Sequence, residues 1–179
     1  MAKPIPSIVC ALGLVSACGF VDFDTVREFA DLSPLTADPA EVTVFLDLPQ
    51  GLGILPGSAN VTFGADRSDS GESDREIYIL QTVEIDGLTG LRIDPVDWPK
   101  FRGQQLRLRA WEAEAPRATE GVFAVDGEPC AFGPGPAPTA TASVFVQLAS
   151  GDGRRPLIDN APVSSWFSTA DLAALPPCG

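Results

Sequence analysis

Short stretches in which apolar residues occupy every second position dominate the chain beyond residue 41. This period of two places the apolar side chains on one face of a strand and is the main sequence signal of β structure. Clusters of Gly, Pro, Asn and Asp separate the stretches. The expected strands are 42–48, 59–65, 76–85, 106–111, 122–125, 143–148 and 157–158. Short strands at this spacing predict a mainly β domain, either an antiparallel β-sandwich or a partly open barrel.

Two short helices are expected beside these strands. Asp94 followed by Pro95 offers an N-cap and a proline at the first helical position, although Pro99 limits the helix that follows. Near the C-terminus, Ser168-Thr169-Ala170-Asp171 resembles a capping box before an apolar run, and Pro176-Pro177 ends that run. The second helix is therefore expected close to the C-terminus.

The composition fits one globular domain. The chain has 179 residues, of which 45% are hydrophobic and 20% charged, and it shows no internal repeat. Chains of this length usually bury a single core, and we assign residues 41–179 to it. The formal net charge of -12 opposes binding to a phosphate backbone, so nucleic acid is excluded as a partner.

The amino terminus has the pattern of a secretory signal. A positive start at Lys3 is followed by a mostly apolar run from Ile5 to Val15 and by the small residues Ser16-Ala17. The run is shorter than the roughly 20 apolar residues that cross a bilayer. We therefore expect residues 1–17 to be a signal peptide that is removed.

Val15-Ser16-Ala17-Cys18 resembles the lipobox of bacterial lipoproteins. The resemblance implies that Cys18 is acylated and becomes the first residue of a lipoprotein, with residues 18–40 as a lipidated tether. Gly19 stands where an acidic residue often favours inner-membrane retention, which implies the outer membrane. Two or more acyl chains anchor stably, so we expect only the lipid to touch the bilayer, with the body in the periplasm.

Two cysteines remain beyond this signal, Cys130 and Cys178. In an oxidising compartment they predict one disulfide bond, which closes a loop of 49 residues and holds the C-terminus. Two reduced thiols are the alternative. The spacing fits neither a C-x-x-C redox pair nor a structural zinc site.

The chain has no histidine. This excludes His-based triads, Cys–His pairs, haem held by His and His-containing zinc sites. Tyr78 is the only tyrosine and is assigned to sheet packing, and Lys100 is the only lysine after the signal. Paired carboxylates are a possible basis for glycoside hydrolysis. In an acidic chain, however, the abundance of carboxylates is no evidence for a catalytic pair. We expect no enzyme activity and no cofactor.

The segment 66–74 has the oxygen-rich composition of calcium loops. Its candidate ligands are Asp66, Asp69, Glu72 and Asp74. In an EF-hand loop starting at Asp66, Gly71 stands at position six as required, but Ile77 stands where the bidentate Glu belongs. A solvated turn between two strands is the simpler interpretation, and weak calcium binding is the alternative.

The densest basic cluster lies between residues 102 and 117, with two tryptophans nearby. Arg and Trp are enriched at interface hot spots. Strand alternation places Arg107, Arg109 and Trp111 on one outward face, which makes them a candidate partner contact. The alternative is a solvated strand face paired with nearby acidic residues.

These observations predict a non-catalytic lipoprotein of the outer membrane that acts as a structural or adaptor component of an envelope assembly. Its expected partners are the membrane, through the lipid, and an envelope protein. The alternative is a periplasmic module that binds a glycan or calcium, and a hydrolase with paired carboxylates is the third possibility.

Overall fold

The computed structural model describes residues 34–85 and 88–179. The signal, the lipobox with Cys18, and the tether up to residue 33 lie outside the described residues. The strands are β1 (Thr43–Asp47), β2 (Leu52–Ile54), β3 (Asn60–Arg67), β4 (Ser73–Ile85), β5 (Leu88–Ile93), β6 (Thr119–Asp126), β7 (Pro129–Ala131), β8 (Thr141–Gln147) and β9 (Arg155–Pro162). The helices are η1 (Pro95–Asp97), α2 (Trp98–Glu114), η2 (Val163–Ser165) and α3 (Thr169–Ala173).

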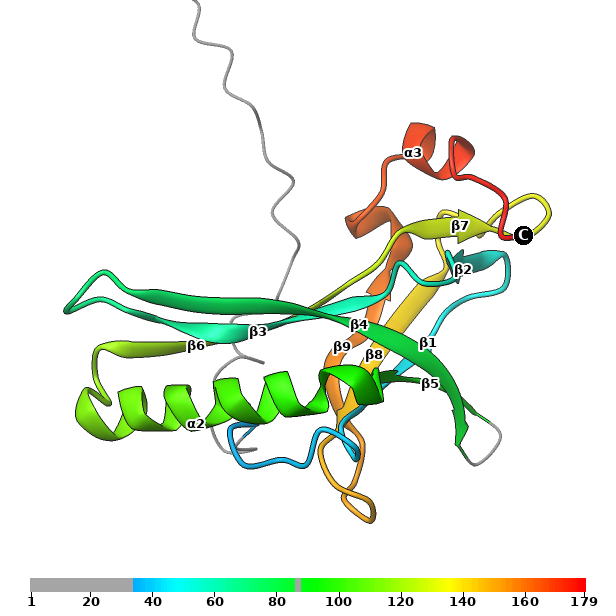
Figure 1. Ribbon diagram of the computed structural model, residues 1–179. Helices are drawn as coiled ribbons and strands as arrows, with labels where there is room; N and C mark the ends of the chain where they lie inside the picture. Colours follow the sequence, from blue (N-terminus) through cyan, green and yellow to red (C-terminus); the bar gives the residue numbers. More distant parts are fainter. Residues whose placement is uncertain (1–33, 86–87) are drawn as a thin grey trace, which may run out of the picture.

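Seven strands form one antiparallel sheet in the order β6-β3-β4-β5-β1-β8-β9. The sheet curls into a half-barrel, and β2 and β7 pair separately as a small second sheet (Figure 1). The mainly β, antiparallel class is confirmed, and of the two architectures the partly open barrel is the one present. Six of the seven expected strands are confirmed as β1, β3, β4, β6, β8 and β9.

Strand β4 belongs to both halves of the sheet. Its first part pairs with β3, from Ser73 opposite Asp66 to Ile79 opposite Asn60. Its second part pairs with β5, from Leu80 opposite Ile93 to Ile85 opposite Leu88. The long strand thus carries one continuous face across the bend between the two halves.

Helix α2 lies along one face of the sheet (Figure 1). Phe101 stacks on Phe63 of β3 with ring centroids 4.6 Å apart and meets the edge of Tyr78 of β4 at 5.1 Å. Leu108 is buried in the same cluster. This packing fixes which face of each strand becomes the core.

The expected strand 106–111 is wrong, because these residues lie within the helix α2. The buried positions of α2 are Phe101, Gln104, Gln105 and Leu108, which follow helical spacing. Two of the four are glutamines, so the apolar pattern of the helix is hidden. Pro99 lies in the first turn, where a missing N–H costs nothing, and therefore does not shorten the helix.

Both expected helix starts are confirmed. Asp94 caps η1 by accepting the Val96 N–H at 2.9 Å. Ser168 and Asp171 form a capping box at α3, in which each accepts the backbone N–H of the other. None of the helices in the described part of the chain is long and apolar enough to span a bilayer.

Cys130 and Cys178 form a disulfide bond, which confirms that prediction. The last residues also pair with β7, because the Ala131 N–H donates to Pro176 O and the Cys178 N–H donates to Ala131 O. Gly53 of β2 lies against the disulfide, where an added Cβ would come within 2.8 Å of Cys178 Sγ. The C-terminus is therefore held by the disulfide and by backbone hydrogen bonds.

Candidate functional site

The outer face of β4 exposes large apolar side chains. Tyr78 and Leu80 are buried toward α2, so Ile77 and Ile79 point to the opposite side of the sheet. Their side chains are 61% and 47% exposed, and Leu88, at the far end of the same face, is 45% exposed. We call this surface the β4 stripe, made of Ile77, Ile79, Val83, Ile85 and Leu88. The sequence predicted that the β4 members share a face, and the structure places that face on the outside.

The β4 stripe continues onto its neighbours. Thr62 of β3 and Ala124 of β6 lie in the same row as Ile77. Asp126 lies in the row of Ile79, and Glu120 lies nearer the hairpin tip on the same face. The result is a surface whose apolar side chains are interrupted by Gln81 and bordered by carboxylates on β6.

Gly64 leaves this face without a side chain in the row of Arg75 and Val122. A Cβ added at Gly64 would stand 2.3 Å from Asp74 O and 2.7 Å from Arg75 Cα, both backbone atoms of β4. No side chain therefore fits between Arg75 on β4 and Val122 on β6 in that row. Any side chain at residue 64 would push the two strands apart.

The predicted contact face of Arg107, Arg109 and Trp111 does not form, because α2 replaces the expected strand. Arg109 is about 200° around the helix from the other two. Arg107 Nε donates to Asp74 Oδ2 at 2.7 Å. Trp111 is half-buried in the core, with the Arg67 guanidinium 5.9 Å from its ring centroid. Arg107 and Arg109 are both exposed on α2, but Arg107 is tied to Asp74, whereas Trp111 is withdrawn into the core.

The candidate calcium ligands are not brought together as a set. Asp66 accepts hydrogen bonds from Ser73 and Arg75, and Asp69 is paired with Arg67 at 2.7 Å. Asp74 is paired with Arg107 at 2.7 Å. Hydrogen bonds from these arginines hold the pKa of each of the three aspartates below its ordinary value. Glu72, the fourth candidate, accepts from the Ser70 hydroxyl at 2.8 Å.

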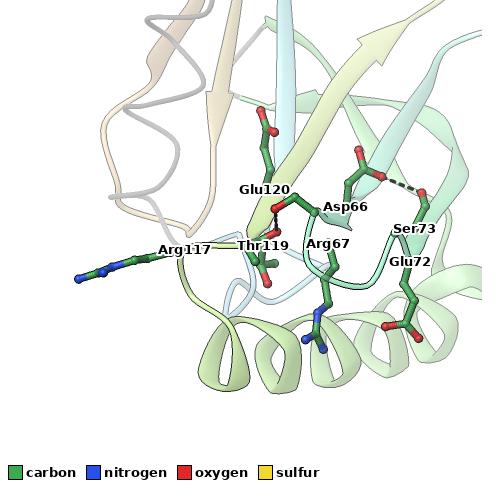
Figure 2. A pocket seen from close by; sticks show the side chains of 10 residues that line it. Asp66, Arg67, Glu72, Ser73, Arg117, Thr119 and Glu120 are labelled. Atoms are coloured by element: carbon green, nitrogen blue, oxygen red, sulfur yellow. Dashed lines mark hydrogen bonds between the residues drawn. The ribbon is translucent and has the colours of Figure 1, made fainter.

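Metal-binding clusters are likewise absent from residues 34–85 and 88–179, where three or more His, Cys, Asp or Glu side chains nowhere converge. A pocket of about 280 Å³ lies between the β3–β4 turn and the start of β6. Figure 2 shows Asp66 bonded to Ser73 at this pocket and Arg117 pointing away from it. Of its charged lining groups, Asp66 is paired with Arg75, and Arg67 is paired with Asp69 and Glu114.

A buried polar network joins α2 to the sheet. The Tyr78 hydroxyl donates to Gln104 Oε1 at 2.8 Å, and Gln104 Nε2 donates to Phe63 O at 3.0 Å and to Asp74 Oδ1 at 2.9 Å. Burial raises the pKa of Tyr78 and keeps its hydroxyl neutral. Every polar side-chain atom buried in the described part of the chain has a partner. The network therefore positions the helix and offers no free group for chemistry.

Reasoning from the sequence missed the β4 stripe as an exposed surface, although its alternation was visible. The exposed face of β4 is identified by the position of α2, because the helix buries the other face of the strand. Comparison with protein-family models, with curated proteins and with solved structures gives no match to this chain.

Proposed function

We propose that this chain is a lipoprotein of the outer membrane whose β domain is a non-catalytic adaptor in an envelope assembly. Acylated Cys18 anchors it, and the β4 stripe docks the protein partner. The observation that carries the proposal is the exposure of Ile77 and Ile79 on a sheet face that α2 does not cover. Exposed apolar patches of this kind mark interaction surfaces in soluble proteins.

The chemistry of the stripe defines the partner. An interface of this type has an apolar centre and a polar rim. The rim here includes Glu120 and Asp126, and the whole chain carries a net charge of -12. A protein surface with apolar side chains surrounded by Lys or Arg is complementary to it, and the charges favour the correct register and a fast association.

The single tyrosine and Lys100 have structural roles, which supports a binding function. The chain has no histidine. Its only tyrosine donates to Gln104, and Lys100 Nζ is paired with Glu76 at 2.8 Å. These side chains stabilise α2 against the sheet.

The alternative of a glycan- or calcium-binding module has less support. Trp98, Trp111 and Trp166 are each half-buried, and the Arg67 guanidinium lies 5.9 Å from the ring centroid of Trp111. Trp98 Nε1 also donates to Ile93 O at 3.1 Å. The carboxylates of the proposed calcium loop are engaged with arginine and serine side chains.

Crosslinking and affinity capture of the full-length protein from its own membranes tests the proposal. The test variant is Ile77→Gln with Ile79→Gln, and the control is Leu106→Gln, which removes an equally exposed (61%) side chain from α2. We expect the double variant to lose a stoichiometric envelope protein that both the wild type and the control retain. The captured protein is identified by mass spectrometry, and its binding is measured again with both proteins purified.

Two results would count against the proposal. Retention of the partner by the double variant would move the interface elsewhere. An intact mass without acyl chains on Cys18 would remove the lipid anchor.

A further inference from the structure

The two edge strands of the seven-stranded sheet differ in how they end it. β9, at one edge, contains Pro156 and Pro162, its pairing with β8 shifts register twice, and Asn160 has a left-handed backbone with φ of 48°. Prolines and bulges are features with which proteins prevent another strand from adding to a sheet edge. β6, at the other edge, pairs with β3 without a break over its eight residues and contains neither proline nor lysine. Of the two edges, β6 is therefore the one that can accept a further strand.

The backbone of β6 presents alternate hydrogen-bonding groups to the open side. Ala118 O accepts the Ser68 N–H at 2.9 Å, so the carbonyl of residue 118 points toward β3. Because successive residues of a strand direct their backbone groups to opposite sides, the N–H and C=O groups of Gly121 and Val125 point away from β3. No other strand pairs with β6, and no backbone hydrogen bond reaches Gly121 or Val125 from another element within residues 34–85 and 88–179. We call these outward backbone groups the β6 edge.

The space beside the β6 edge is open at Gly121. Within the described residues, nothing lies within 4 Å of a Cβ built there. On the outer face of the strand, Val122 and Ala124 are half-buried, and Ala124 lies in the row of Ile77. A strand added along β6 would therefore widen the same face of the sheet that carries the β4 stripe.

Two carboxylates on β6 define which strand fits. Glu120 and Asp126 lie on the outer face at the two ends of the strand, and both are exposed. Neither forms an ion pair with a Lys or Arg in the described part of the chain. Arg75, whose charge interacts with Glu120, is already paired with Asp66. Opposite charges directly across from each other stabilise a strand pair, so the complementary strand has Lys or Arg at both ends.

The same carboxylates disfavour a second copy of this chain. A two-fold axis centred on residue 123 would pair the outward groups of Gly121 in one copy with those of Val125 in the other. In that register Glu120 of each copy lies opposite Asp126 of the other, and like charges in this position destabilise a strand pair. The net charge of -12 adds repulsion between copies.

We propose that the β6 edge binds an extended segment of the protein partner, which adds to the sheet as a further strand. The segment has Lys or Arg opposite Glu120 and Asp126. Between them, small or apolar side chains lie opposite Val122 and Ala124. The proposal rests on the adaptor function and names how the partner of the β4 stripe is recognised. Backbone hydrogen bonds provide affinity and alternate side chains provide specificity, as in other complexes formed by strand addition.

The test measures backbone amide exchange by NMR in the purified processed protein. The probe is the capped peptide Lys-Thr-Val-Thr-Val-Thr-Lys, and the control peptide has Glu in place of both Lys. We expect the Lys peptide to slow exchange at Gly121 and Val125 several-fold. The amides of Val122 and Ala124, which face β3, should change little, and the Glu peptide should have a much weaker effect.

Two sets of variants assign the effect to the edge. Gly121→Pro removes an outward N–H, which an edge strand tolerates, and should abolish the slowing at Val125, whereas Gly121→Ala keeps the N–H and should retain it. Circular dichroism checks that both variants fold. Glu120→Lys with Asp126→Lys leaves the backbone unchanged and should reverse the preference, so that the Glu peptide binds more tightly.

Three results would overturn the proposal. The first is unchanged exchange at Gly121 and Val125 with the Lys peptide at millimolar concentration. The second is equal slowing by both peptides. The third is slowing by an increase in protein concentration alone, which would assign the edge to a second copy.

Capture from native membranes separates this proposal from the adaptor function. Gly121→Pro should lose the partner that Gly121→Ala retains. Capture by both glycine variants would overturn strand addition and leave docking at the β4 stripe intact. A wild type that captures no partner would remove the adaptor function, and the peptide measurement would still decide whether the β6 edge binds a basic strand.

Discussion

Replacement of Gln104 by leucine removes the centre of the contact between α2 and the sheet. The side chain is 1% exposed and bonds to β3 through Phe63 O and to β4 through Tyr78 and Asp74. Leucine has a similar volume but no amide. The variant therefore leaves the core filled and changes only its hydrogen bonding.

The expected loss of stability follows from the partners left behind. Asp74 keeps its pairing with Arg107, but the Tyr78 hydroxyl is fully buried and loses its acceptor. A buried polar group without a partner costs about 1–3 kcal/mol, and the Phe63 carbonyl also loses a donor. We expect Gln104→Leu to lower the free energy of unfolding by about 2–4 kcal/mol, a large share of the roughly 5–15 kcal/mol that stabilises a domain.

Urea unfolding followed by circular dichroism measures this loss, and a double-mutant cycle assigns it. Tyr78→Phe removes the hydroxyl whose hydrogen bond Gln104 Oε1 accepts. In that background, Gln104→Leu should cost about 1–2 kcal/mol less than in the wild type, because no hydroxyl is left without an acceptor.

Two results would refute the reasoning. The first is a Gln104→Leu protein as stable as the wild type with an unchanged m-value, since the buried network would then contribute nothing. The second is a cycle with no coupling, which would show that the two side chains act independently.

Three further predictions concern the fold. Burial raises the pKa of Tyr78, so the free energy of unfolding should fall as the pH rises above about 10, the ordinary pKa of a tyrosine in an unfolded chain. The tyrosinate absorbance of this single tyrosine should appear only when the protein unfolds. Titration of Tyr78 in the native protein near pH 10 would contradict the prediction. Gly64→Ala should lower the free energy of unfolding by about 1–3 kcal/mol, because the added Cβ meets the β4 backbone. The control Gly121→Ala places its Cβ in open space and should change the free energy of unfolding by less than about 1 kcal/mol. Equal melting temperatures of the two variants would disprove the close approach at Gly64. Reduction of the disulfide bond between Cys130 and Cys178 should lower the melting temperature by several degrees, since a disulfide that closes a loop of this size contributes up to about 4 kcal/mol. An unchanged melting temperature with both thiols alkylated would show that the bond is not stabilising.

Alternation of apolar residues was sufficient to predict most of the sheet. In β1, β3, β4 and β8 the period of two is local and strong, so no knowledge of the partner strands was needed. The strand β5 escaped prediction because Gly90 interrupts its short pattern. β2 and β7 have three residues each and owe their structure to each other and to the disulfide.

The helix α2 was not predictable from apolar pattern alone. Its core positions include Gln104 and Gln105, which are buried only because Tyr78, Phe63 O and Pro34 O supply partners from distant parts of the chain. In the sequence these glutamines are indistinguishable from solvated ones. Long-range hydrogen bonds, not local propensity, decide their burial.

The candidate site failed to emerge from the sequence for the same reason. β4 has apolar residues on both faces, with Tyr78 and Leu80 on one and Ile77 and Ile79 on the other. Only the packing of α2 decides which pair is buried. Once the segment 106–111 was assigned to a strand, the exposed face of β4 was undetermined.

Site-specific photo-crosslinking in native membranes tests the central claim most directly. Ile77→benzoylphenylalanine and Leu106→benzoylphenylalanine place the same probe on opposite sides of the sheet, at positions of equal exposure (61%). The account predicts a discrete protein adduct from position 77 and no protein adduct from position 106. An absence of adduct at position 77, or the same protein adduct from both positions, would contradict it.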